Sequence, residues 1–198
     1  LHYLPHDRAR EPAYGESASG PMSSRHIYVD ETKQKDYLLV ASVHVADNID
    51  AVRGIIRELL LPGQRYLHMK DENDGRKRTI AAALVAADIK ATVYRAGNVH
   101  RTHNQRRAAC LDGLIQDHAQ GPETLLVIDR DDTLVNADRK VLYQAVRTRG
   151  RSETIHYEHR SNKTELLLAV PDAIAWCWAK GGEWRALIRP AVNEVREV

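Results

Sequence analysis

The chain has 198 residues, 43% of them apolar, which is enough material for one ordinary hydrophobic core. Its 29 basic and 27 acidic side chains give a formal charge of only +2, so a nucleic-acid footprint would have to be a local patch. No apolar run reaches the roughly 18 residues that span a bilayer. Two cysteines, Cys110 and Cys177, lack the spacing of a zinc site and the density of a secreted disulfide scaffold. We therefore expect a cytoplasmic protein with reduced, buried thiols and no membrane contact.

The amino-terminal stretch differs in composition from the rest. Residues 1–24 are rich in Pro, Gly, Ser and charge, which predicts a flexible arm in front of one folded domain at residues 25–198. Met22 could be a natural start, in which case the residues before it would be upstream sequence. The fold is therefore predicted from residue 25 onward.

Apolar periodicity predicts strands first, and then helices and strands in alternation. The expected strands cover residues 27–31, 37–45, 91–94, 124–129 and 154–157. The expected helices cover about residues 49–60, 72–87, 105–118 and 137–147, with a final helix in 166–178. The first two strands should pair antiparallel through a turn at residues 32–35. This order predicts an α/β fold, a sheet of mixed direction with helices over its faces.

Three apolar segments run into an aspartate, at Asp30, Asp129 and Asp172. Strands that pack side by side bring their ends together, so these acids can converge at one edge of the sheet. Two carboxylates about 4 Å apart repel by roughly 4 kcal/mol at an effective dielectric near 20, and a hard divalent ion would remove that conflict. The sequence therefore predicts a site for Mg²⁺ or Mn²⁺ with these three metal ligands.

The alternation of side chains along a strand separates the first two acids. Asp30 shares a face with Tyr28, whereas the neighbouring Glu31 points to the other face, so Asp30 is the preferred ligand. Asp129 shares a face with Val127 at the end of a strand. The alternative for Asp129 is a structural one, because aspartates at strand ends often cap the following turn.

The position of Asp172 also allows two interpretations. With Pro171 at the first position of a helix, Asp172 would lie in the first turn, where the helix dipole favours a carboxylate. A helix that continues through a proline kink would instead place Glu165 and Asp172, seven residues apart, on one face. The second arrangement favours a functional role.

Basic side chains near these positions are candidates for phosphate binding. Lys70 and Lys163 are predicted to bind the substrate, and His68 to relay a proton, because imidazole titrates close to neutral pH. The other candidates are arginines that precede the last helix or follow the third strand: Arg160, Arg101, Arg106 and Arg107. Each of these groups, taken singly, also fits an ordinary solvated side chain.

Short motifs along the chain carry a family resemblance. Tyr28-Val29-Asp30-Glu31-Thr32 is similar to an opening strand-Asp-Glu-Ser motif, and His68 falls where a His-containing motif is expected. Asp129 follows the central strand, and Ser161 with the segment 172–175 is similar to a closing Ser and a Gln-x-Ala-Asp helix. In these features the chain resembles a widespread bacterial family, the domain of unknown function 3800 family.

This resemblance implies a ribonuclease H-like fold, in which carboxylates on the first strand, a later strand and the last helix bind two divalent metals. Those roles would fall on Asp30, Asp129 and Asp172. The chain departs from the family pattern at three positions: Thr32 replaces Ser, Ala169 replaces Gln and Pro171 replaces Ala.

The hypothesis is a metal-dependent nuclease that cleaves DNA or RNA by a two-metal mechanism. The first alternative is a ribonuclease H-like scaffold that binds without cutting, its site disabled at Ala169 and Pro171. The second is a phosphatase, because the segment 126–135 resembles the strand-Asp-x-Asp-x-Thr-Leu signature of haloacid dehalogenase-like phosphotransferases. There Asp129 would be the nucleophile and Asp131 the general acid.

Overall fold

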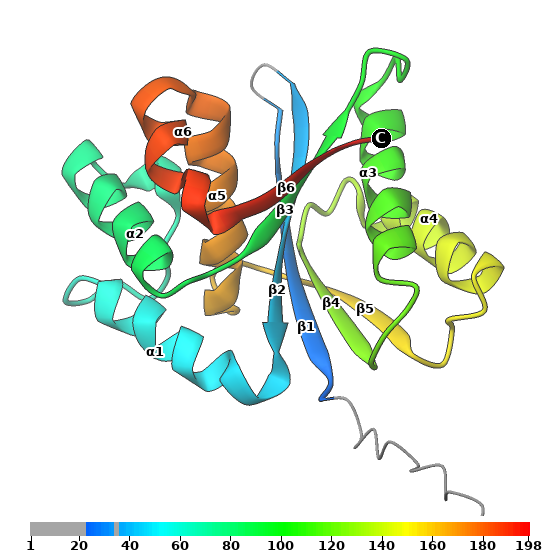
Figure 1. The fold of residues 1–198 in the computed structure, drawn as a ribbon, viewed down its shortest axis with the longest axis horizontal. Helices are drawn as coiled ribbons and strands as arrows, with labels where there is room; N and C mark the ends of the chain where they lie inside the picture. Colours follow the sequence, from blue (N-terminus) through cyan, green and yellow to red (C-terminus); the bar gives the residue numbers. More distant parts are fainter. Residues whose placement is uncertain (1–22, 34–35) are drawn as a thin grey trace, which may run out of the picture.

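The computed structural model of the chain describes residues 23–33 and 36–198, and its centre is one six-stranded sheet in the order β5-β4-β1-β2-β3-β6 (Figure 1). The strands are β1 (Arg25–Thr32), β2 (Tyr37–Val45), β3 (Ala91–Ala96), β4 (Thr124–Asp129), β5 (Ile155–Arg160) and β6 (Val192–Glu197). β2 is antiparallel to β1 and β3, whereas β4 runs parallel to β1 and β5 parallel to β4. The predicted antiparallel pair of first strands is confirmed; its turn lies partly outside the described residues.

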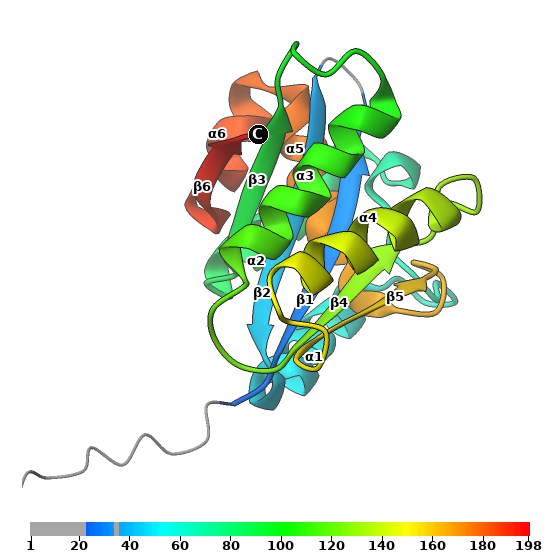
Figure 2. The ribbon, with the colours of Figure 1, turned by 90° about the vertical axis from the view of Figure 1, so that its right-hand side faces the viewer.

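Helices cover both faces of the sheet, which confirms the predicted α/β class with a mixed sheet flanked by helices (Figures 1 and 2). One face carries α1 (Ile49–Leu59), α2 (Asp74–Ala86), α5 (Ala169–Lys180) and α6 (Gly182–Ile188). The other carries α3 (His103–Asp117) and α4 (Val135–Thr148), which lie in front of the sheet in Figure 2. We call these the α5 face and the α3/α4 face.

The strand side chains divide between two cores by simple alternation. Tyr28 of β1 and Val127 of β4 pack in the core on the α5 face. Their neighbours Ile27, Val29 and Leu126 pack in the core on the α3/α4 face. Because side chains two residues apart share a face, Asp30 and Asp129 continue the rows that end at Tyr28 and Val127 and lie on the α5 face.

The start of α5 corrects the expected helix. α5 begins at Ala169, so Pro171 lies in the first turn, where its missing N–H removes no helical hydrogen bond. Glu165 lies outside this helix and caps the preceding 3₁₀ turn η3 (Leu166–Leu168), where its side chain accepts from the Leu167 N–H. The expectation of a helix running through a kink, with Glu165 and Asp172 on one helical face, is therefore wrong.

Two elements at the end of the chain were not expected. Gly181 and Gly182 have positive φ angles of 76° and 54° and separate α5 from α6. β6 then pairs parallel to β3 at the edge of the sheet. Its sequence Val-Asn-Glu-Val-Arg-Glu shows little burial, because an edge strand packs on few neighbours.

Some expectations fall partly or wholly outside what the structure tests. The predicted arm at residues 1–24 lies almost entirely outside the described residues, and the single domain at residues 25–198 stays a prediction. In the described part of the chain, every helix is too short or too polar to cross a membrane. Cys110 and Cys177 are free and buried, as predicted.

Candidate active site

Asp30 and Asp129 lie next to each other in the sheet because β1 and β4 are parallel neighbours. Val29 pairs with Ile128 in the ladder, and each is followed by its aspartate. Both acids therefore lie at the same end of the sheet, where the parallel strands β1 and β4 reach their carboxyl ends. We call this end of the sheet the acidic edge, or simply the edge. Both are partly buried and continue the α5 face.

Asp172 approaches this edge from the helix that covers it. It lies in the first turn of α5, and its side chain is only 12% exposed. The Met69 N–H donates a hydrogen bond of 2.7 Å to Asp172 Oδ2, and His68 Nε2 lies 3.6 Å from Oδ1. The 3₁₀ turn η2 (Met69–Asp71) and α5 thus hold this carboxylate between them.

The three carboxylates share one anchoring pattern: a backbone N–H donates to one oxygen of each. Glu31 N–H donates to Asp30 Oδ1 at 2.7 Å, and Asn162 N–H donates to Asp129 Oδ1 at 3.2 Å. With the Met69 bond to Asp172, each acid has a fixed orientation and a second oxygen that these backbone bonds leave unused. Such second-layer hydrogen bonds are what orients metal-binding carboxylates in proteins.

The acids are close enough to affect one another's ionisation. Burial raises the pKa of Asp30 well above its ordinary value, and the charges of Asp172 and Asp129 raise it further. Burial also raises the pKa of Asp172 to about 6, against the lowering effect of His68 and the Met69 N–H. The pKa of Asp129 is raised, again chiefly by burial. The protein therefore supplies too little positive charge at this edge to keep the pKa values of the three acids in their ordinary range.

The ligand atoms at this edge are of the type that binds a divalent metal ion, but they are not already arranged as a metal site. Among residues 23–33 and 36–198, no three or more His, Cys, Asp or Glu side chains are close enough together to hold one ion. Asp30, Asp129 and Asp172 therefore do not form a ready-made site for one ion. Their hard carboxylate oxygens and raised pKa values nevertheless suit Mg²⁺ or Mn²⁺. The metal-ligand roles of Asp30, Asp129 and Asp172 stay a prediction.

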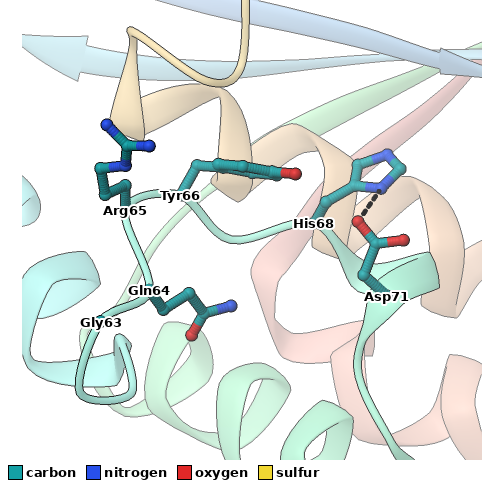
Figure 3. Close-up of a pocket in the computed structure, with 6 residues that line it drawn as sticks. All are labelled: Gly63, Gln64, Arg65, Tyr66, His68 and Asp71. Atoms are coloured by element: carbon teal, nitrogen blue, oxygen red, sulfur yellow. Dashed lines mark ion pairs between the residues drawn. The ribbon is translucent and has the colours of Figure 1, made fainter.

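His68 lies between two acids, one of which the sequence did not single out. Its Nε2 faces Asp172, and its Nδ1 lies 3.5 Å from Asp71 Oδ2 (Figure 3). Both separations exceed an ordinary hydrogen bond, so these are charge contacts that strengthen when the imidazole is protonated. The sequence feature that could have indicated Asp71 is its spacing of three residues from His68. In a 3₁₀ turn, side chains three residues apart lie on the same side of the turn.

The two predicted substrate-binding lysines are exposed and flank this region. Lys70 belongs to η2, between Met69 and Asp71. Lys163 follows β5, and its ammonium lies 6.0 Å from the centre of the Tyr66 ring. Within the part of the chain that the structure describes, neither lysine forms an ion pair. Their role in binding substrate stays a prediction.

A buried charge network on the α3/α4 face corrects the expectation for Arg107. Its guanidinium donates to both oxygens of Asp138 at 2.6 and 2.9 Å and also to Glu31. His159 Nε2 lies 2.9 Å from Asp138 Oδ2, and Tyr37 completes the network. The Arg107 side chain is only 3% exposed, so it cannot reach a phosphate. Of the basic residues that follow the third strand, Arg107 is therefore no longer a candidate for phosphate binding.

The structure gives Asp131 a local role in its turn. Its Oδ1 accepts from both the N–H and the hydroxyl of Thr133, at 3.0 and 2.6 Å. These bonds hold the pKa of Asp131 below its usual range, whereas a general acid needs a raised pKa. The observation argues against the haloacid dehalogenase-like phosphatase.

Comparison with known proteins adds one structural similarity. No protein-family model and no curated protein sequence matches the chain. Its structure is similar to a crystal structure of a mutant of Bst-RNase HIII, with a TM-score of 0.47 and 16% identity over 85% of this chain. The chain spans 57% of the length of that protein. A similarity at this level carries no argument about binding or cleavage, and membership of the domain of unknown function 3800 family stays a prediction.

Proposed function

We propose that this chain is a metal-dependent nuclease that hydrolyses phosphodiester bonds at the edge formed by β1, β4 and α5. The observation that carries the proposal is that Asp30, Asp129 and Asp172, from three separate elements on the α5 face, lie near enough for the charges of the other two to raise the pKa of Asp30. Each has one oxygen held by a backbone N–H, and no protein cation offsets the burial and mutual repulsion that raise the pKa of Asp30. A structural role alone would not require three acids to share such an edge.

Asp30, Asp129 and Asp172 would hold Mg²⁺ or Mn²⁺. When bound, such ions activate water and stabilise the oxygens of a phosphodiester under in-line attack. The chain's own part is to fix the carboxylates: the backbone N–H groups of Glu31, Asn162 and Met69 prevent their rotation away from the edge. This fixed orientation would keep the carboxylate oxygens in place to bind the metal during the reaction.

His68 and the lysines supply the remaining groups. His68 lies between Asp172 and Asp71, and an imidazole in that place can pass a proton to or from a group at the edge of the site. Lys70 and Lys163 are exposed and would attract the phosphates of a DNA or RNA strand. His68 and Lys70 lie at η2, which contacts α5, and Lys163 follows Asn162, whose N–H donates to Asp129.

The test is cleavage of single-stranded, duplex and hybrid substrates in magnesium or manganese by the variants Asp30→Asn and Asp172→Asn. Each should lose more than about 100-fold in rate, because loss of even the partners of metal ligands can cost that much. Asp88→Asn is the matched control. Asp88 is exposed in the α2–β3 connection, and asparagine tolerates its positive φ of 54°.

The scaffold alternative gives a different result in the same assay. A non-catalytic binding protein would hold nucleic acid without cutting it, whatever the metal. Wild-type-like cleavage in both aspartate variants would remove the proposed site, and binding without cleavage by the unaltered chain would favour the scaffold.

A further inference from the structure

A pocket of about 310 Å³ opens directly beside the proposed site, on the connection between α1 and η2. Its lining residues are Gly63, Gln64, Arg65, Tyr66, His68 and Asp71. Figure 3 shows the Tyr66 ring nearly edge-on, with Arg65 on one side and His68 on the other. In this view the hydroxyl end of the Tyr66 ring points toward His68, the imidazole that contacts Asp172.

We propose that this pocket receives one unpaired base of a single-stranded nucleic acid, stacked on the ring of Tyr66. The inference rests on the proposed function for the bond that is cut, and it adds the form of the substrate. A base in a duplex already stacks on its neighbours and pairs across the helix, so only an unpaired or extruded base can lie on the tyrosine.

Tyr66 has the surroundings of a stacking platform. Its side chain is partly exposed, and the Lys163 ammonium lies 6.0 Å from the ring centre, at the outer limit of a cation–π contact. A phenol ring needs a hydrogen-bond partner or solvent for its hydroxyl, and an open pocket provides solvent. An aromatic surface beside a lysine matches the two requirements of single-strand binding, a π face and a positive charge near the backbone.

The Gln64 amide in this loop is already hydrogen-bonded and is not free to read a base. Gln64 Oε1 accepts from the Leu61 N–H at 3.0 Å, and its Nε2 donates to Glu72 at 2.6 Å. Gly63 makes the turn with a φ of 81°, which favours glycine. Because the amide of Gln64 is already used, stacking dominates over base-edge hydrogen bonds, and the pocket should accept all four bases with similar affinity.

Arg65 provides a contact for the backbone of the bound strand. It is exposed, and in the described ranges it forms no ion pair, so its guanidinium is available for a phosphate. Arg65 and Lys163 both lie near Tyr66, whereas His68 leads from the pocket to Asp172. The strand would therefore run from the stacked base across His68 to the proposed site of cleavage.

The test measures binding of a labelled single strand of about 12 nucleotides, as DNA and as RNA, by fluorescence anisotropy in EDTA so that no strand is cut. Tyr66→Ala should weaken binding by about 5- to 150-fold, the range expected for loss of one stacked base. Tyr66→Phe keeps the ring and should stay within about 2-fold of the unaltered chain. Binding to a blunt duplex of the same sequence should change by less than about 2-fold in both variants.

Tyr143→Ala is the matched control. Tyr143 is 55% exposed on α4, and the Arg147 guanidinium lies 5.8 Å from its ring centre, so it offers a similar aromatic and cation pair away from the pocket. Its loss should leave single-strand binding unchanged. Equal effects of Tyr66→Ala and Tyr143→Ala, or equal losses in Tyr66→Ala and Tyr66→Phe, would overturn the stacking proposal. Absence of single-strand binding by the unaltered chain would overturn it as well.

The outcomes also separate this inference from the proposed function. If Asp30→Asn abolishes cleavage while Tyr66→Ala binds and cuts single strands normally, the nuclease stands and the base pocket fails. If Tyr66→Ala loses single-strand binding but the unaltered chain cuts no substrate, the base pocket stands and the hydrolysis fails.

Discussion

Asp30 and Glu31 are neighbours on β1, yet their carboxylates lie on opposite faces of the sheet and in different electrostatic surroundings. Glu31 pairs with Arg107 in the buried network of the α3/α4 face. Asp30, on the α5 face, meets Asp172 and Asp129, and their charges add to the effect of burial in raising its pKa. The end of β1 thus carries Glu31, which is paired with an arginine, and Asp30, which lies near two other acids.

Acids that only support the fold are paired with basic side chains in this protein, as Asp138 shows. Burial would raise the pKa of Asp138, but hydrogen bonds from His159 and Arg107 outweigh it and hold the pKa below its usual range. No comparable arginine pairs with Asp30, Asp129 or Asp172 among the described residues. Because the same chain supplies a buried arginine on one face, the missing counter-charge on the other supports a functional use.

The largest expected effect comes from breaking the neutralised region. Arg107→Met takes the guanidinium away from Glu31 and Asp138, which keep only Lys33 and His159 as partners, so the free energy of unfolding should fall by about 3–5 kcal/mol. Urea unfolding measures this change. The control is Arg149→Met, which removes a bidentate pair with the half-exposed Asp112 and should cost less than about 1 kcal/mol. Similar losses in the two variants would show that the network does not stabilise the fold in this way.

A divalent cation should act on the other region alone. Magnesium or manganese at about 100 times its dissociation constant should stabilise the chain by about 2.7 kcal/mol, seen as a rise in melting temperature. Asp30→Asn removes one of the proposed ligands and should lose most of that gain. Asp88→Asn, far from the edge, should keep it. An equal rise in melting temperature in all three proteins would show that the cation binds elsewhere.

The acidic edge should also destabilise the metal-free chain at high pH. The folded-state pKa of Asp172 is about 6 against an ordinary 3.8, so the stability present at low pH is lost as the pH rises through 6. Asp172→Asn keeps an acceptor for the Met69 N–H and removes the charge. Its gain in unfolding free energy should be about 2 kcal/mol larger at about pH 8 than at about pH 4, measured by urea unfolding in EDTA. A loss of stability at both pH values would contradict this balance.

The positions of the acids on β1 and β4 could be predicted from the local sequence of each strand. The apolar run of β4 ends at Asp129 in the structure as in the sequence, because a central strand is apolar on both faces and stops at the first charge. Alternation alone assigned Asp30 and Glu31 to opposite faces. These rules place the side chains, whereas the roles of Asp30 and Asp129 as metal ligands stay a prediction.

The buried network depends on partners that no local pattern reveals. Arg107 is the fifth residue of α3 and has the surroundings of an exposed basic residue in sequence, but Glu31 and Asp138 come from β1 and α4. Its burial is a result of long-range pairing. The pocket at Tyr66 was missed for a similar reason, because it forms where an irregular connection passes Lys163, almost a hundred residues later.

The smallest expected effect lies within one loop and separates Asp129 from Asp131. Asp131→Ala removes the acceptor for both donors of Thr133 and should cost about 1 kcal/mol of unfolding free energy, as loss of a local cap does. Cleavage should be unchanged, because Asp131 lies in the turn and its carboxylate is already used there. Asp129→Asn should instead abolish cleavage and leave the turn intact. Hydrolysis of an aryl phosphate that is lost in both variants would reverse this assignment, because a phosphatase needs both acids.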